Sequence, residues 1–229
     1  MSDRSEVVSA FFDAIRTNND LTVDTALAGD ESLLRARDRD GASAVAIALR
    51  AGNHRLALRF ASRLAPTPNG LDIFDAACLG DVAAIRKLLE VDRAEVDVRG
   101  MDGYTPLHLA AEFGQVEVAR LLLGRGADPN AVSMNERRAT PLHSAITGRH
   151  RDTAGLLLAL GASPNAIEHG GVTALHLAAH YGDETIVDML LLRGADATRK
   201  ADDGKTAVDA AQEAGHSALA RLLRTSSRR

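Results

Sequence analysis

The chain has 229 residues, of which 45% are hydrophobic and 25% charged, and its formal net charge is −4. This balance is typical of a folded globular protein, and without excess basic charge to neutralise phosphates a nucleic-acid partner is disfavoured. A single cysteine, Cys78, excludes an intrachain disulfide and a cysteine-rich metal site.

The N-terminal region predicts two helices. Apolar side chains recur there at helical spacing, at Val8, Phe11, Phe12 and Ile15, and residues 21–28 could form a second helix. We interpret residues 5–36 as a degenerate repeat that caps the N-terminus, because one face of a terminal unit must meet water.

Two weaker units follow. Residues 39–67 open at Asp40-Gly41 and turn at Gly52, and their second arm is irregular near Pro66 and Pro68. Residues 70–98 align better with the later units, although Leu71-Asp72-Ile73-Phe74 departs from the motif that opens those units. We expect each to form a helix–turn–helix unit.

Four clearer units begin at Thr105, Thr140, Thr173 and Thr206, whose spacings are 35, 33 and 33 residues. A period of this size indicates a solenoid of stacked helical units. In each, a threonine can cap a short helix, the chain turns near a glycine, and a leucine-rich helix follows. We place these units at residues 102–130, 136–165, 170–198 and 203–224, and expect residues 225–229 to fray.

The unit at 102–130 carries the most specific signature. It reads Asp102-Gly-Tyr-Thr-Pro-Leu-His-Leu-Ala-Ala, then Gly114, Leu121-Leu-Leu and Gly126-Ala-Asp-Pro-Asn130. This pattern closely resembles the ankyrin repeat. The resemblance implies a single-domain, all-α repeat solenoid with β-hairpin-like fingers, containing about six repeats plus the degenerate cap. It also implies protein binding through the fingertips and inner helices, with no catalysis and no cofactor.

One unit departs from the pattern. Arg138 stands where a finger glycine is expected, and Arg149 stands at the turn position held by Gly114 and Gly182. We expect Gly148 to supply that turn one residue early. The finger at 132–139 is lengthened and should protrude, which favours a role in contacts.

His108, His143 and His176 invite a catalytic interpretation, but they recur at the repeat period. That recurrence predicts a structural role, with each ring hydrogen-bonded to the backbone between neighbouring fingers. His176 and His180 lie four residues apart near Asp183, which leaves a metal-dependent protein as an alternative of another class. Spacing fixes no third ligand, so we expect no metal site.

Cys78 aligns with Glu112, and we expect a partly exposed, inert thiol.

The hypothesis that these features favour is a non-catalytic adaptor or scaffold that binds another protein along its concave surface. Aromatic and charged side chains on a rigid face are common binding anchors. We expect the partner-binding residues to be Met101, Tyr104, Glu112, Phe113, Arg137, Arg138, Thr147, His169, His180 and Tyr181. A regulatory inhibitor of a co-encoded enzyme is an alternative that would use the same surface.

The N-terminus is charged, and no apolar run is long enough to span a bilayer. We therefore expect a soluble, cytoplasmic protein. We also expect it to be monomeric on its own.

Overall fold

A computed structural model describes residues 4–65, 70–91 and 96–226. Within these ranges the chain forms fourteen α-helices and no β-strand, which confirms the predicted all-α repeat solenoid. The helices come in consecutive pairs: α1 Arg4–Arg16 and α2 Asp20–Gly29, α3 Ala44–Arg50 and α4 His54–Leu64, α5 Ile73–Leu79 and α6 Val82–Val91, α7 Pro106–Glu112 and α8 Val116–Gly124, α9 Pro141–Thr147 and α10 Arg151–Ala159, α11 Ala174–Tyr181 and α12 Glu184–Leu192, and α13 Ala207–Glu213 and α14 Ser217–Ser226.

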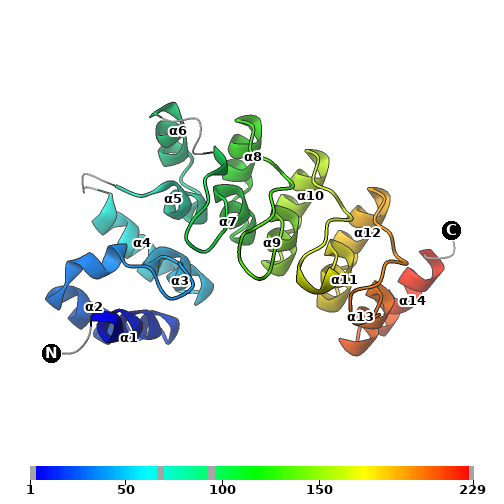
Figure 1. Ribbon diagram of the computed structural model, residues 1–229, viewed down its shortest axis with the longest axis horizontal. Helices are drawn as coiled ribbons and strands as arrows, with labels where there is room; N and C mark the ends of the chain where they lie inside the picture. The colour runs from blue at the N-terminus through cyan, green and yellow to red at the C-terminus, as the bar shows by residue number, and fades with distance from the viewer. Residues whose placement is uncertain (1–3, 66–69, 92–95, 227–229) are drawn as a thin grey trace.

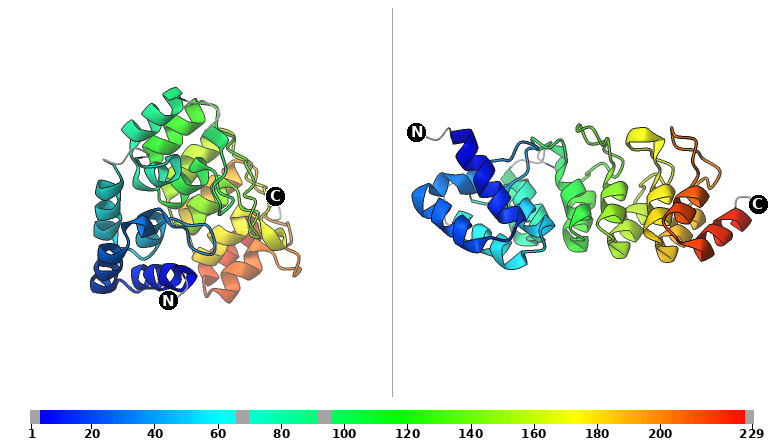
Figure 2. Two further views of the ribbon diagram at one scale, coloured as in Figure 1. Left: turned by 60° about the vertical axis from the view of Figure 1, so that its left-hand side comes forward. Right: turned by 90° about the horizontal axis from the view of Figure 1, so that it is seen from below.

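The pairs stack side by side in one curved array, with the termini at opposite ends (Figure 1). Each odd-numbered helix packs on the next odd-numbered helix, while α6, α8, α10 and α12 form a second row. The loops that precede α7, α9, α11 and α13 project together from one side of the helices (Figure 2). We call these loops, and the corresponding loop before α3, the fingers.

The terminal regions of the structure agree in part with the segments expected from the sequence. The helices expected in the N-terminal region are present as α1 and α2. Pro66 and Pro68, near which an irregular arm was expected, lie outside the described residues. At the other end α14 continues through Ser226, so the first two residues of the expected frayed tail are helical, and residues 227–229 lie outside the described residues.

The repeated threonines start the inner helices. Thr105, Thr140, Thr173 and Thr206 each form a capping box with the residue three positions later. In the last unit Asp209 takes the place of the histidine, and its Oδ2 accepts the Thr206 N–H at 2.9 Å. Losing such a cap typically costs about 1 kcal/mol, so the motif stabilises every unit that carries it.

The unit built from α9 and α10 replaces two turn glycines with arginines. Arg138 has a φ of 50° and Arg149 a φ of 62°, both in the left-handed region that glycine normally occupies. Gly148 has a φ of −72°, so the expectation that it supplies the turn was wrong. The chain instead accepts a strained arginine at each turn, which places both side chains on the surface.

The buried core has two parts. One lies among α1 to α4, and the other continues from α5 to α14, with Leu49 packed against both. They meet where α3 packs on α5, a contact we call the joint. There the Ser43 hydroxyl donates to Asp75 Oδ1 at 2.6 Å, and Arg37 pairs with Asp72. Burial, together with the Asp72 charge, raises the pKa of Asp75 to about 6.

Fingers approach one another through glycines. A β-carbon on Gly41 would lie 2.5 Å from the Asp102 nitrogen, and one on Gly103 would lie 2.7 Å from the Asn135 nitrogen. The finger before α3 therefore touches the finger before α7 directly, across the intervening pair α5–α6. The lack of the opening motif in that pair is consistent with this contact.

We expect Gly103→Ala to destabilise the array by about 2–3 kcal/mol, because the new methyl group meets finger backbone and φ is +77°. Gly204→Ala is a matched control, since φ is +82° there but no atom lies within 4 Å of the added carbon. It should show only the backbone strain of about 1 kcal/mol. Urea denaturation of both variants measures the difference, and equal losses would contradict the close finger contact.

Candidate functional site

The candidate site is the surface made by the fingertips and by the adjoining C-terminal ends of the inner helices. We call it the finger–helix face. Met101 is 81% exposed at a fingertip, and Arg137, Arg138, His169 and His180 are also exposed. The half-buried members are Glu112, Phe113, Thr147 and Tyr181. Nine of the ten residues expected to bind a partner thus reach the surface in this structure.

Tyr104 is the exception. It is only 8% exposed, and its ring lies 5.3 Å from the His108 ring, so the expectation of an exposed aromatic anchor was wrong. Ala139, which also directly precedes a capping threonine, is buried as well. Tyr104 contributes to the core and only one edge of it borders the surface.

Three of the expected residues come together around Arg137. Its guanidinium lies 3.4 Å from the Thr147 hydroxyl and 3.4 Å from a Glu168 carboxylate oxygen. The His169 N–H donates to the Arg137 carbonyl at 2.7 Å, which joins two neighbouring fingertips. Burial raises the pKa of Glu168, and the Arg137 charge opposes that shift. These contacts hold one fingertip against an inner helix.

The two aromatic residues on the inner helices each meet an arginine. Arg50 lies 6.0 Å from the centre of the Phe113 ring, and Arg149 lies 5.1 Å from the centre of the Tyr181 ring. Such cation–π contacts hold each guanidinium near the ring face by electrostatic attraction. Sequence reasoning missed Arg50 and did not assign Arg149 to the site. The signal for Arg50 was its alignment with Glu112, two residues before the turn glycine.

Arg50 also binds Glu112 through two hydrogen bonds, of 2.7 and 2.9 Å. The pair α5–α6 lies between them, and Cys78 occupies the corresponding position there. Its small side chain lets the arginine span two units. Cys78 is fully buried, so the expectation of partial exposure was wrong, and burial raises the pKa of its thiol. The thiolate needed for reactivity is therefore disfavoured.

The repeated histidines are structural. His108 Nε2 lies 2.9 Å from the Ala139 carbonyl, and His176 Nε2 lies 3.1 Å from the Lys205 carbonyl, as the repeat pattern predicts. His143 is different, because its Nε2 has no hydrogen-bond partner, although its Nδ1 accepts the Thr140 N–H. The finger that follows it contains a 3-10 turn at His169–Gly171, unlike its neighbours.

The metal-dependent alternative finds no support in the geometry. His176 uses Nδ1 for Thr173 and Nε2 for the Lys205 carbonyl, so neither nitrogen is free for a metal. Asp183 caps α12 and pairs with Arg151 at 2.8 Å. Among the described residues no three histidine, cysteine, aspartate or glutamate side chains are grouped as metal ligands.

Two grooves run along this part of the array. One, of about 430 Å³, lies between helix turns and contains Arg149, Arg151, Asp152 and Asp183, so its charges balance. The other, of about 680 Å³, lies between the fingers before α3, α7 and α9 and reaches down to Arg50 and Glu112. We call it the fingertip groove. The expected binding residues include its members Met101, Tyr104, Glu112 and Arg137 but not Met134, which is 76% exposed.

Comparison with known proteins supplies the family. A family model for ankyrin repeats in three copies matches residues 73–168, and a second ankyrin model, for many copies, matches residues 157–211. The chain belongs to the ankyrin repeat family. Ankyrin repeats are generally protein–protein interaction modules and are generally non-catalytic. The fingers and inner helices described above are therefore ankyrin fingers and ankyrin inner helices.

Several curated proteins are similar to the chain. Ankyrin repeat and SOCS box protein 3 of Bos taurus is 38% identical over 73% of this chain and 33% of its own length. The transient receptor potential cation channel subfamily A member 1 homolog of Caenorhabditis elegans is 37% identical over 65% of this chain and 12% of its own. Ankyrin repeat and SAM domain-containing protein 6 of Rattus norvegicus is 30% identical over 60% of this chain and 12% of its own.

This ankyrin array therefore matches a third or less of each of these relatives. The similarity concerns the repeats and not the remaining parts of those proteins. Among the described residues, no helix combines the length and the apolar character needed to cross a bilayer.

Proposed function

We propose that this ankyrin array is a non-catalytic adaptor that binds a partner protein through the finger–helix face. Ankyrin repeats generally serve protein–protein interaction, and the proposal assigns that role to one surface of this chain. The contact would run from the fingertips Met101 and Arg138 to the inner-helix residues Phe113 and Tyr181.

The observation that supports the proposal most directly is the pair of strained arginine turns. Arg138 and Arg149 adopt left-handed backbone conformations where other units use glycine, at a cost of about 1 kcal/mol each. In return the array gains two exposed cations on the finger–helix face. A preformed surface of this kind loses little conformational entropy on binding, which favours affinity.

A pull-down from native lysate tests the proposal. We expect the combined change Phe113→Ala, Arg138→Gly and Tyr181→Ala to abolish recovery of the specific partner, because it removes two aromatic contacts and one cation. Glycine suits position 138, since it accepts the left-handed backbone there. Circular dichroism confirms that the variant is folded.

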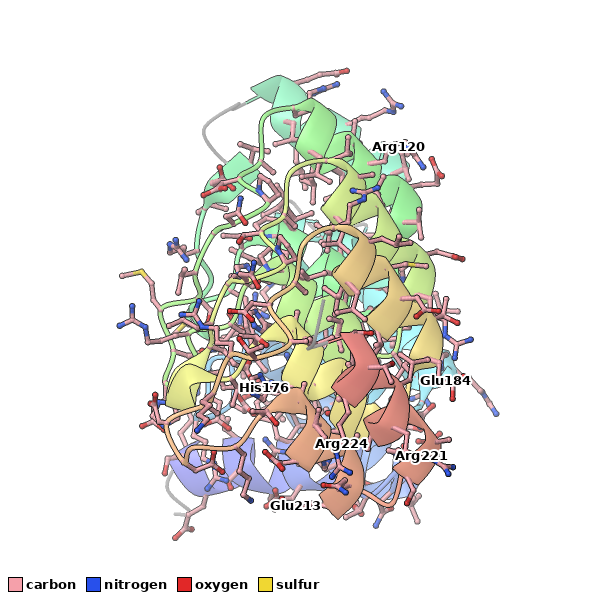
Figure 3. The ribbon with its side chains drawn as sticks, turned by 90° about the vertical axis from the view of Figure 1, so that its right-hand side faces the viewer. Arg120, His176, Glu184, Glu213, Arg221 and Arg224 are labelled. Atoms are coloured by element: carbon pink, nitrogen blue, oxygen red, sulfur yellow. The ribbon has the colours of Figure 1, made fainter. Side chains whose placement is uncertain are left out.

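A matched control lies on the other side of the array. Figure 3 shows Arg120 on α8 and Glu184 on α12 on the side of the array away from the fingers. The combined change Arg120→Ala and Glu184→Ala should leave recovery unchanged. Equal recovery with the finger–helix variant and with wild type would contradict the assignment of the face.

A further inference from the structure

We propose that the fingertip groove binds an extended segment of a partner protein in which a lysine or arginine adjoins a large aliphatic side chain. This inference rests on the proposed function and names the chemistry of the bound segment. It follows from the apolar contacts in the groove and from the balance of its charges.

Two methionines provide the apolar contacts. Met101 and Met134 lie on neighbouring fingers, are 81% and 76% exposed, and both border the groove. Their fingers are held together, since the Met134 N–H donates to the Gly103 carbonyl at 3.0 Å. Methionine side chains are flexible and polarisable, so exposed pairs adapt to aliphatic side chains of different shape. Two exposed apolar side chains at one groove indicate an interaction site.

The charge of the groove is negative. Its lining includes four acids, Asp40, Asp102, Glu112 and Glu136, and two bases, Arg50 and Arg137. Both bases already have carboxylate partners, because Arg50 binds Glu112 and Arg137 lies 3.4 Å from Glu168. Asp40 forms a loose ion pair with Arg39, at 3.8 Å between two exposed side chains, which contributes little. The groove therefore presents carboxylates that a partner's cation can neutralise.

Asp102 is a half-buried acid that lines the groove. Its carboxylate accepts the Tyr104 N–H at 3.2 Å, and its backbone carbonyl accepts from the Asn135 side chain at 2.9 Å. Burial raises the pKa of Asp102, with a further increase from the Glu112 charge that the Tyr104 N–H and Arg50 oppose. No ion pair joins Asp102 to another residue in the described part of the chain, and a half-buried carboxylate interacts more strongly with an incoming cation than a fully exposed one does.

The groove lies where two fingers from non-consecutive units of the chain meet. The finger before α3 meets the finger before α7 directly, and no described residue of the α5–α6 unit lines the groove. The groove extends from Asp40 on the finger before α3 to Glu136 on the finger before α9. An extended segment can lie across it with alternate side chains facing the methionines and the carboxylates.

A selection from a random peptide library of about 12 residues, displayed on phage and applied to the full chain, tests the inference. We expect the enriched peptides to carry lysine or arginine next to leucine, isoleucine or methionine. Synthetic copies should lose affinity by about tenfold or more for Met101→Ser with Met134→Ser, and for Asp102→Asn with Glu136→Gln. Asparagine at 102 can still accept the Tyr104 N–H, so the fold should be retained.

The control combines Leu192→Ser with Glu184→Gln, which changes one exposed leucine and one exposed acid on α12, and should alter affinity by less than about twofold. Peptides without net positive charge, equal affinity for the groove variants, or a selection without enrichment would each overturn the inference. A different result distinguishes the failure of this inference from the failure of the proposed function. A partner lost with the Phe113, Arg138 and Tyr181 variant but kept by both groove variants would support the finger–helix face and reject the groove.

Discussion

Acidification from about pH 7 to about pH 5 is expected to destabilise the α7 and α9 units by about 4 kcal/mol in total. His108 and His143 are buried, and burial lowers the pKa of each ring from 6.5 to about 4. The hydrogen bond to the Ala139 carbonyl partly offsets that effect for His108, while Arg99 lowers the pKa of His108 further and Arg137 that of His143. Each ring is therefore neutral in the folded chain near neutral pH.

Acid lowers the free energy of unfolding because the unfolded state binds more protons than the folded state does. The unfolded histidines protonate as the pH falls through 6.5, while the folded rings stay neutral until about 4. The stabilisation is thus complete above the unfolded pKa and is lost progressively below it, by about 2 kcal/mol per histidine at pH 5. Asp75 acts in the opposite direction at the joint, because its folded pKa of about 6 lies above the ordinary value of 3.8.

Urea denaturation at several pH values, with hydrogen exchange of α7 and α9 amides, measures this dependence. The double variant His108→Asn and His143→Asn provides the comparison, since Asp209 shows that a shorter oxygen acceptor closes the same capping box. We expect this variant to be less stable than wild type near neutral pH and to lack the loss of stability that wild type shows between pH 7 and pH 5, so that the remaining pH dependence reports groups such as Asp75. An unchanged pH slope in the variant would contradict the role of the two rings.

The second large effect concerns the core. We expect Leu142→Ala to cost about 3–4 kcal/mol, because Leu142 is completely buried in α9 between the α7 and α11 units. Leu192→Ala is the matched control, since Leu192 is 84% exposed and the same deletion there leaves no cavity. Its cost should be below about 0.5 kcal/mol.

The loss of stability caused by Leu142→Ala should also be confined to α9 and the units that neighbour it. Packing in a solenoid is mainly between neighbouring units, and the core among α1 to α4 meets the core that contains Leu142 at the joint, away from α9. Hydrogen exchange should therefore accelerate in α7, α9 and α11 while the amides of α1 and α3 remain protected. Uniform acceleration along the whole chain would show that the joint transmits the damage and that the two cores unfold together.

The fold was predictable because each unit repeats the same local chemistry. Thr105, Thr140 and Thr173 cap helices, and a leucine-rich helix follows at a fixed distance, so period and composition specified the stacking. The array needs no long-range feature beyond this repetition. Asp72, which caps α5 without the usual motif, shows how a degenerate unit retains the same start.

The candidate site was less predictable, because its details depend on contacts between units. Tyr104 looked exposed from its place on a finger, but it is buried with its ring beside the His108 ring. Arg50 reaches Glu112 only because the unit between them carries Cys78 at the corresponding place. Nothing in the sequence around Arg50 or around Glu112 indicates that the unit between them leaves room for this contact. The φ values of Arg138 and Arg149 are likewise set by the packing of the unit and not by residue type.

The central claim is that a partner protein binds the finger–helix face, and photocrosslinking in cells tests it most directly. A photoreactive phenylalanine analogue placed at Met101 or Arg138 samples the fingertips, and the same analogue at Arg120 or Glu184 samples the far side of the array. We expect a discrete crosslinked partner from the first two positions and none from the last two. Crosslinking of the same partner only from Arg120 or Glu184 would contradict it.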